Sequence, residues 1–228
     1  MRIRFTTLPA LAASLVLAAG ALAPAGAVDV PEDCAVPPDI DLDAFNVIIG
    51  TDASETIIGT KGPDAICALL GDDVILAGAG DDIVLGDTST FFGNVGAAGG
   101  DARIEAGPGA DQVLSGPGDD EVAAGPGDDF VALAVGDDSA SGGPGADVVQ
   151  GGLGTDTFAG GPGDDVAAGG PGDDTLNGGA GDDLLAGALL PGSPPPPIPI
   201  PPSSGDRCIG ASGVDAAIDC DVLVGIEG

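Results

Sequence analysis

Aspartate recurs every nine residues through the middle of the chain, without a change of phase. A glycine precedes each of these aspartates by two residues, and an apolar side chain follows each by two residues. The regular set is Asp111, Asp120, Asp129, Asp138, Asp147, Asp156, Asp165, Asp174 and Asp183. A fixed period is typical of solenoid proteins, in which each repeat is one unit stacked on the next. The period therefore predicts a stacked repeat fold before any other feature is considered.

The same frame extends toward the N-terminus. It places aspartates at Asp64, Asp73 and Asp82, and it can be traced back to Glu55 and Asn46. Asp82 and Asp111 are 29 residues apart, which is three periods plus two. We therefore expect a small insertion at 86–96, after which the frame resumes with Ala102 where an aspartate belongs.

One unit, 169–177, explains the expected local structure. Numbered from one to nine, it has glycine at positions one, two and four, proline at position three and aspartate at positions five and six. Glycine permits backbone angles that side chains forbid, and proline fixes one torsion of a turn. Thr175, Leu176 and Asn177 then form a short strand with one side chain pointing inward. Two units, or 18 residues, close one lap of a flattened parallel coil, so we predict an all-β fold.

Coiling in laps of 18 residues stacks the regular aspartates in two columns. Asp111, Asp129, Asp147, Asp165 and Asp183 share one edge, and Asp120, Asp138, Asp156 and Asp174 share the other. Neighbouring laps lie about 4.8 Å apart. Like charges at that distance repel by about 1 kcal/mol in water and about 4 kcal/mol at an intermediate dielectric. A hard cation between laps would replace this repulsion with ligation, and calcium accepts carboxylates and carbonyls more readily than magnesium does.

The charge balance supports a cation as partner. The chain has 37 acidic and five basic residues, a formal net charge of −32. Nucleic acids and anionic lipids require a basic patch, so we expect neither as a partner. Residues 1–27 resemble a secretory signal peptide, with Arg2 and Arg4 before an apolar stretch and Ala25 to Ala27 as a cleavage site. The alternative, a transmembrane anchor, conflicts with an apolar run interrupted by proline and glycine. We expect a secreted, extracellular protein, with association to the cell surface left open.

Four cysteines remain after the expected cleavage: Cys34, Cys67, Cys208 and Cys220. In an exported chain they are expected to form two disulfides. We favour Cys34 with Cys67 and Cys208 with Cys220, because each pair flanks one end of the repeats. A four-cysteine zinc site is the competing interpretation, although the chain has no C-x-x-C spacing and no histidine.

The unit resembles the repeats-in-toxin (RTX) nonapeptide, most closely at 160–168, 169–177 and 178–186. The resemblance implies a right-handed parallel β-roll loaded with several calcium ions, about seven for the regular block if each gap holds one. It also implies that the aspartate at position six and the carbonyls at positions two and four are the ligands. The expected ligands are Asp64, Asp73, Asp82, the nine regular aspartates, and Gly107, Gly109, Gly116, Gly118, Gly125, Gly127, Gly143, Gly145, Gly152, Gly154, Gly161, Gly163, Gly170, Gly172, Gly179 and Gly181. The unit 133–141 departs from the pattern, and we expect a weak site there.

The sequence divides into five predicted segments. These are a signal peptide at 1–27, an N-terminal cap with degenerate repeats at 28–58, a roll at 59–186, a proline-rich loop at 187–204 and a C-terminal repeat with its cap at 205–228. Histidine-dependent catalytic motifs are excluded, and no phosphate loop or nucleophile elbow occurs. We therefore predict a calcium-binding protein that is not an enzyme. The alternative is a structural or adhesive surface spacer in which calcium is purely structural.

Two further patterns concern the surface. At position seven, alternate units carry Gln112, Phe130, Val148, Val166 and Leu184, whereas the other units carry Glu121, Ser139, Thr157 and Thr175. We hypothesise that the apolar face is covered by a terminal segment or by a second molecule; scattered apolar surface residues are the alternative. The acidic residue at position five is expected to face solvent, with outer-sphere help to calcium as the other interpretation.

Overall fold

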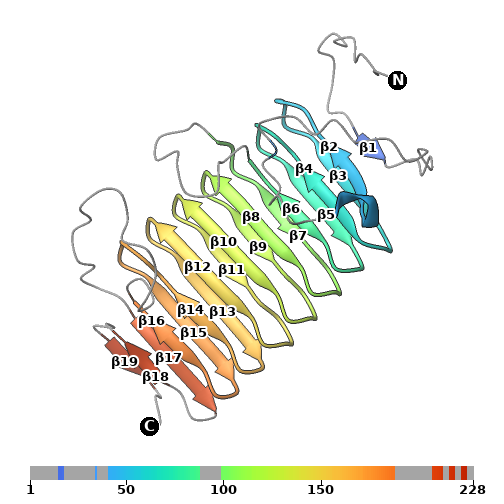
Figure 1. The fold of residues 1–228 in the computed structure, drawn as a ribbon. Coiled ribbons are helices and arrows are strands. Elements are labelled where there is room, and N and C mark those ends of the chain that lie inside the picture. Colours follow the sequence, from blue (N-terminus) through green and yellow to red (C-terminus); the bar gives the residue numbers. More distant parts are fainter. Residues whose placement is uncertain are drawn as a thin grey trace.

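Two long parallel sheets wind around one core. The computed structural model describes residues 15–17, 34, 41–87, 99–187, 207–212, 216–218 and 222–224. Strands alternate between a ten-stranded sheet, here sheet A, and a nine-stranded sheet, here sheet B. Every pairing between these strands is parallel, and successive laps stack side by side along the roll (Figure 1). The predicted all-β parallel roll is therefore confirmed.

The elements are short, as the dense glycine and proline require. One 3-10 helix, η1 (Leu42–Ala44), precedes the roll. Sheet A contains β1 (Leu15–Leu17), β3 (Thr56–Thr60), β5 (Val74–Gly78), β7 (Arg103–Glu105), β9 (Glu121–Ala123), β11 (Ser139–Ser141), β13 (Thr157–Pro162), β15 (Thr175–Ala180), β17 (Arg207–Ser212) and β19 (Val222–Val224). Sheet B contains β2 (Asn46–Ile49), β4 (Asp64–Cys67), β6 (Ile83–Leu85), β8 (Gln112–Pro117), β10 (Phe130–Val135), β12 (Val148–Leu153), β14 (Val166–Ala168), β16 (Leu184–Ala186) and β18 (Ala216–Ile218).

The register confirms the lap of 18 residues. Val131 pairs with Val113 on one side and with Val149 on the other. Across the predicted insertion the offset grows by eleven residues, because Val74 pairs with Arg103 and Ile83 pairs with Gln112. Residues on the two sides of the insertion still pair position for position, as Val74 does with Arg103. The extra residues therefore belong to a single turn and do not change the register of the strands.

The core is a double file of apolar side chains between the sheets. Each strand contributes its position-eight residue, and those from sheet A stack as Ile57, Ile75, Ile104, Val122, Ala140, Phe158, Leu176 and Cys208. The sheet B file is Ile48, Ile66, Val84, Val113, Val131, Val149, Ala167 and Leu185. Full burial of one such side chain contributes about 1.5–3 kcal/mol. The core is only two side chains thick, so hydrophobic burial alone gives this fold a small free energy of unfolding.

The departing unit 133–141 fills its core in a different way. Ala140 is small, but Leu133 at position one, where later units have glycine, is 1% exposed and joins the same cluster. Phe158 lies beside Ala140 in the next lap. These larger neighbours occupy space next to Ala140, so the unit keeps its place in the stack.

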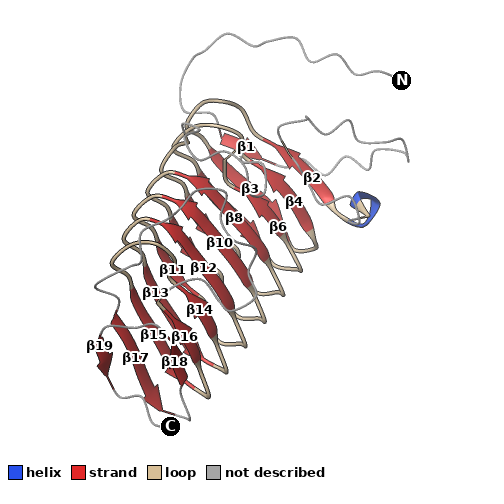
Figure 2. Cartoon of the chain, turned by 60° about the vertical axis from the view of Figure 1, so that its left-hand side comes forward, coloured by secondary structure: helices blue, strands red, loops and turns tan. Residues whose placement is uncertain are grey.

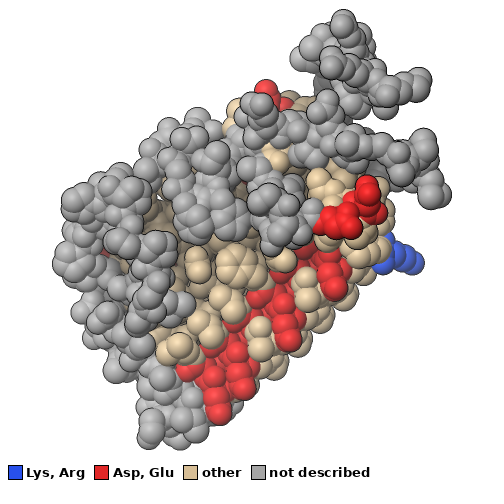
Figure 3. Space-filling model, viewed as in Figure 1, with Lys and Arg blue, Asp and Glu red and all other residues tan. Residues whose placement is uncertain are grey.

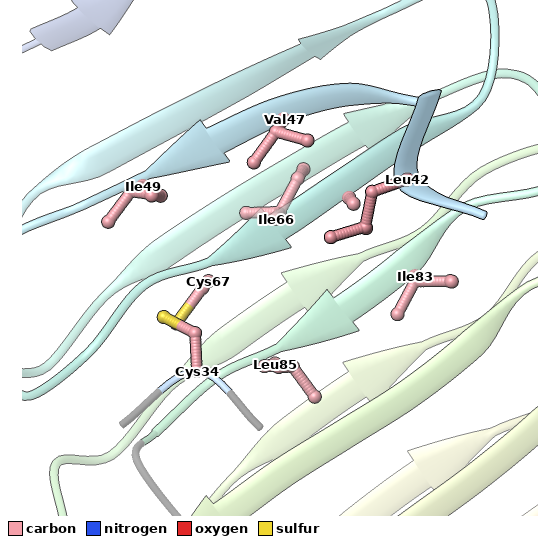
Figure 4. Close-up of a pocket in the computed structure, with 9 residues that line it drawn as sticks. Cys34, Leu42, Val47, Ile49, Ile66, Cys67, Ile83 and Leu85 are labelled. Carbon is pink, nitrogen blue, oxygen red and sulfur yellow. A yellow bond between two sulfur atoms is a disulfide. The ribbon is translucent and has the colours of Figure 1, made fainter. Parts of the chain in front are cut away.

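The N-terminal end of sheet B is covered on its outer face. Cys34 forms the predicted disulfide with Cys67 of β4, and Leu42 of η1 lies over the same strands (Figure 4). Beneath this cover, Ala65 and Ile83, both at position seven, are 5% and 4% exposed. At the other end, Cys208 is buried and disulfide-bonded. Its predicted partner Cys220 lies outside the described residues, as does most of the proline-rich segment 187–204.

Further along, the outer face of sheet B keeps its apolar stripe. Phe130, Val148, Val166 and Leu184 pair in register and are half-buried. On sheet A, Glu121, Ser139 and Thr157 at the same position are exposed, and Thr175 is half-buried. Gln112, the first residue of the sheet B series, is exposed. The asymmetry read from the sequence is therefore a real difference between two faces, although what covers the stripe stays a hypothesis.

The segment predicted as a signal peptide contributes one short strand. Leu15–Leu17 pairs in parallel with β3, with Val16 opposite Ile57. Cleavage at the predicted site would remove this strand and leave β3 at the edge of sheet A. Within the described part of the chain, no helix is long and apolar enough to cross a membrane.

Candidate calcium sites in the turns

The aspartates at position six form two buried columns, one at each edge of the roll. Column A precedes the strands of sheet A and column B precedes those of sheet B, and the turns that carry them line the edges (Figure 2). Every one of the twelve predicted ligand aspartates is at most 3% exposed. Acidic side chains also form a continuous band along one edge of the surface (Figure 3). The columns are therefore lines of buried carboxylates, a costly arrangement without partners.

One oxygen of each carboxylate holds the laps together. The N–H of Asp111 donates to Oδ1 of Asp129, and the N–H of Asp129 donates to Oδ1 of Asp147, at 2.8 and 2.9 Å. The same bond recurs in both columns at 2.8–3.0 Å, from Asp64 to Asp82, Asp82 to Asp111, Asp120 to Asp138, Asp138 to Asp156, Asp147 to Asp165, Asp156 to Asp174 and Asp165 to Asp183. Position six is thus a structural position as well as a candidate ligand.

The second oxygen has no hydrogen-bond donor in most of these carboxylates. It is buried in Asp73, Asp82, Asp111, Asp129, Asp138, Asp147, Asp156 and Asp165. A buried acceptor left without a partner costs about 1–3 kcal/mol, and more when it is charged. The same oxygen is unsatisfied in lap after lap, which makes Oδ2 the candidate ligand atom.

Glycine keeps the space around this oxygen open. A Cβ added at Gly142, Gly151 or Gly160 would fall on the Oδ2 atom of the aspartate five residues later. In these later units, glycine at position one leaves the space beside Oδ2 open, because a Cβ there would displace the carboxylate. Earlier units carry a side chain at position one, such as Ala106, Ala124 or Leu133, so this open space is a feature of the later units.

Carbonyl oxygens point into the gaps between laps. A Cβ at Gly125, at position two, would strike the carbonyl oxygen of Gly107, and one at Gly127, at position four, would strike that of Gly109. The turn N–H groups at these positions donate instead to the carbonyls at positions one and three of the next lap, as Gly125 does to Gly142 and Gly127 to Pro144. The carbonyls at positions two and four thus face the inter-lap space that glycine leaves open.

Position two needs a positive φ in every regular turn. Its glycines from Gly107 to Gly179 have φ between +99° and +123°. Two other residues accept this conformation at the same position, Ala134 at +96° and Leu69 at +79°. Both were missing from the predicted ligand set, as were Gly71, Gly78, Gly80 and Gly136. Counting back from Asp73, Asp82 and Asp138 would have found them, since the turn uses their backbone and not their side chains.

Burial raises the pKa of the column carboxylates. Desolvation is the largest cause throughout, backbone hydrogen bonds oppose it, and neighbouring aspartates add to it. Together they raise the pKa to about 6 for Asp73, Asp82, Asp129, Asp156 and Asp165, to about 7 for Asp111 and to about 8 for Asp138. Charged carboxylates are therefore unfavourable here without a cation.

The first carboxylate of each column is satisfied without a cation. In Asp64, Oδ2 accepts the Thr60 N–H at 2.5 Å and Oδ1 accepts Asn46 Nδ2 at 2.6 Å. In Glu55, Oε1 accepts the Thr51 N–H at 2.6 Å. Asp64 was a predicted ligand, yet its environment differs from that of the later aspartates. Threonine at position two replaces the open space found in the later turns.

The acidic residues at position five are exposed, as expected, but they also bond. The N–H of Asp137 donates to Oδ1 of Asp119 at 2.9 Å, and the N–H of Thr155 donates to Oδ1 of Asp137 at 2.8 Å. The direction is opposite to that at position six, since here the later lap donates to the earlier one. These residues join the turns at the surface, a role that the sequence pattern did not reveal.

The donor set fits calcium. Among the described residues no group of three His, Cys, Asp or Glu side chains converges, so a site must combine single carboxylates with backbone carbonyls. Calcium takes six to eight oxygen ligands in flexible geometry and accepts both kinds. The competing four-cysteine zinc site has no support among the described residues, in which Cys34, Cys67 and Cys208 are disulfide-bonded.

A parallel β-roll with buried aspartates and carbonyl-lined turns defines a class of repeat protein that binds calcium. The RTX calcium-binding nonapeptide repeat matches this chain in four copies, at residues 49–84, 97–131, 135–167 and 159–189. These matches cover more than half of the chain, and the protein belongs to the RTX repeat family. No curated protein matches it. The chain thus consists of calcium-binding repeats, with no catalytic domain evident in the described residues.

Proposed function

We propose that this protein is a secreted calcium-binding module whose folding is coupled to calcium. The observation that carries the proposal is the row of buried Oδ2 atoms without a donor. A family match alone would support calcium binding in general. The unsatisfied oxygens, one in most nine-residue turns, are the atoms that would be ligated.

Each ion would be held by one carboxylate and by carbonyls from the turn. For the turn that ends at Asp147, the ligands are Asp147 Oδ2 and the carbonyl oxygens of Gly143 and Gly145. The same set repeats along both columns. When bound, calcium supplies positive charge between carboxylates that repel each other. The chain itself orients the carboxylate. In Asp147, the bond to Oδ1 fixes the group, and Oδ2 faces the space that Gly142 leaves open.

Coupling to folding follows from the balance of forces. The thin apolar core contributes modestly, and the columns oppose folding through desolvation and repulsion. The glycine-rich chain also loses more conformational entropy on folding than an average chain does. Because the ordered columns exist only in the roll, calcium binding free energy becomes folding free energy.

The proposal places the protein outside the cell. The apolar stretch after Arg2 and Arg4 supports export, and the disulfide between Cys34 and Cys67 suits an oxidising compartment. Calcium sites of extracellular modules work at about 10⁻⁴–10⁻³ M. A weak, repeated site would therefore be filled after export and empty before it, so the chain would fold once outside.

The test is a calcium titration of the mature chain followed by circular dichroism, with magnesium and chelator as parallel conditions. We expect an unfolded spectrum in chelator and a strand spectrum with calcium, but not with magnesium alone. A compact parallel coil that persists in chelator with the disulfides reduced would refute the coupling. A strand spectrum with magnesium alone would refute the ion assignment.

A further inference from the structure

Column A has a gap. Asp73 and Asp120 occupy position six in laps on either side of the insertion, and Ala102 stands at position six between them. Its N–H still donates to Asp120 Oδ1 at 2.8 Å, so the backbone keeps the regular geometry. Ala102 is 3% exposed and offers no carboxylate. By the position-six pattern alone, this lap lacks its acidic ligand.

Asp87 lies in the same turn, on the N-terminal side of the insertion. It follows β6, and its N–H donates to the Ser115 carbonyl at 2.8 Å. Gly125 makes the equivalent bond to Gly142 in a regular turn. Asp87 therefore occupies position two, where most turns have glycine, and it brings a side chain into a turn that would otherwise hold none.

The carboxylate of Asp87 lies inside the turn. The residue is 3% exposed, Oδ2 accepts the Gly100 N–H at 2.9 Å, and Oδ1 is buried without a hydrogen-bond partner. One oxygen bonded to the backbone and one left open is the state of the column aspartates. Burial is the main cause that raises the pKa of Asp87 to about 7; the bond from Gly100 opposes it, and the charges of Asp120 and Asp73, the two neighbours of the gap, add to it.

The rest of the turn is regular from Gly100 onward. A Cβ at Gly118 would strike the Gly100 carbonyl oxygen, as in the other turns at position four. A Cβ at Gly99 would lie 2.7 Å from Asp87 Oδ2, so glycine again leaves the carboxylate its space. Carboxylate, open oxygen and position-four carbonyl are all present at the gap.

We propose that Asp87 supplies the carboxylate that Ala102 lacks and completes a calcium site at the insertion. The inference rests on the proposed function and adds a ligand that lies outside the nonapeptide pattern. The insertion then does not interrupt column A, because a residue at its border replaces the missing aspartate. A cation here would tie the two ends of the inserted segment to the roll.

The test is Asp87→Asn in the full mature chain, with bound calcium counted by equilibrium dialysis and affinity measured by calorimetry. We expect one ion fewer per molecule, or one site weakened at least about tenfold, since losing even an outer-shell partner of a metal site typically costs about 10–100-fold in affinity. The matched control is Asp101→Asn, which removes an exposed charge from the same turn. It should retain the full ion count.

A rescue variant separates ligation from folding. Asp87→Ala combined with Ala102→Asp moves the carboxylate to its regular position and should restore the wild-type ion count. Two results would overturn the inference: an Asp87→Asn protein with unchanged count and affinity, or a double variant that does not regain the count. If the wild-type chain bound no calcium, the proposed function itself would fail, which is a distinguishable outcome.

Discussion

Oδ1 of Asp147 accepts the N–H of Asp129 one lap earlier at 2.9 Å, while Oδ2 of the same carboxylate is buried with no donor. The two oxygens therefore have different roles: Oδ1 joins neighbouring laps, and Oδ2 is the candidate calcium ligand. Asparagine at this position would keep an oxygen for the Asp129 N–H and put an amide nitrogen where Oδ2 stands. This substitution separates the structural bond from ligation.

The first prediction compares Asp147→Asn with Asp64→Asn. Both aspartates belong to column B and both are 0% exposed. Asp147 lacks a donor at Oδ2, so its variant should bind calcium at that site at least about tenfold more weakly, the low end for losing a partner at a metal site. Asp64 is satisfied by Thr60 and Asn46, so its variant should keep the wild-type number of bound ions. Calorimetric titration measures both, and equal losses in the two variants would contradict the distinction.

The second prediction concerns the backbone of position two. Ala134 has φ +96°, which costs an L-residue about 1–2 kcal/mol, so Ala134→Gly should raise the calcium-saturated free energy of unfolding by about 1 kcal/mol. Gly152 lies one lap later with φ +123°, and a Cβ there would strike the Ala134 carbonyl oxygen. Gly152→Ala should therefore destabilise by more than Ala134→Gly stabilises. Urea unfolding in saturating calcium measures both, and effects of the same sign would count against the argument.

Much of this fold could be predicted from the sequence because its repeat is local. Nine residues specify one turn and one strand, and the period then gives the lap, the two columns and the core file. The insertion was also visible as a change of phase between Asp82 and Asp111, but its predicted start at residue 86 was too early, because Gly86 and Asp87 still occupy positions one and two of the turn. The Cys34–Cys67 disulfide was also predicted, since each cysteine lies near the N-terminal end of the repeats.

What the sequence did not reveal depends on contacts across laps or outside the frame. Asp87 has the wrong phase for a ligand, and only the folded turn shows that it lies in the gap at Ala102. Asp64 has the right phase, with a glycine two residues before it, yet Thr60 and Asn46 satisfy its carboxylate. The bonds between position-five residues have the same origin, because the pattern gives spacing and not the direction of an N–H.

The third prediction concerns the disulfide between Cys34 and Cys67. It closes a segment with a sequence separation of 33 residues. On the chain-entropy account, a loop of this length contributes about 3–4 kcal/mol. Replacing both cysteines with serine should lower the free energy of unfolding by this amount and raise the calcium concentration needed for folding. Because Cys34 covers sheet B only near β4 and β6, hydrogen exchange should increase at Ile83 and not at Leu185. A uniform increase would argue against a local cap.

The fourth prediction is a dependence on pH in the absence of calcium. The raised pKa values mean that the roll prefers protonated aspartates, whose ordinary pKa is 3.8. The stability that the folded chain gains from these protonated carboxylates is fully present below about pH 4. It is lost as pH rises through the folded values, from about 6 for Asp82 to about 7 for Asp111 and about 8 for Asp138. Calcium-free chain should thus become more compact between pH 8 and pH 5, as seen by small-angle scattering. Equal molecular dimensions at pH 8 and pH 5 would contradict this prediction. A dilution series is the control for aggregation.

The fifth prediction tests the apolar stripe on sheet B. Ala65 and Ile83, at the same position, are already buried beneath the segment that contains Cys34 and Leu42. If the rest of the stripe is also covered, the amides of Val148 and Val166 should exchange more slowly than those of Ser139 and Thr157.

The four amides form a matched set. Each donates to the carbonyl of an aspartate one lap earlier at 2.8–2.9 Å, so intrinsic hydrogen bonding does not distinguish the two faces. Protection that grows with protein concentration would identify a second copy as the cover, whereas protection independent of concentration would identify a segment of the same chain. Val148→Thr with Val166→Thr should abolish the difference in either case, because it removes the apolar contact area and keeps the shape of the strand. Equal exchange on the two faces of the wild-type roll would show that the stripe is simply exposed.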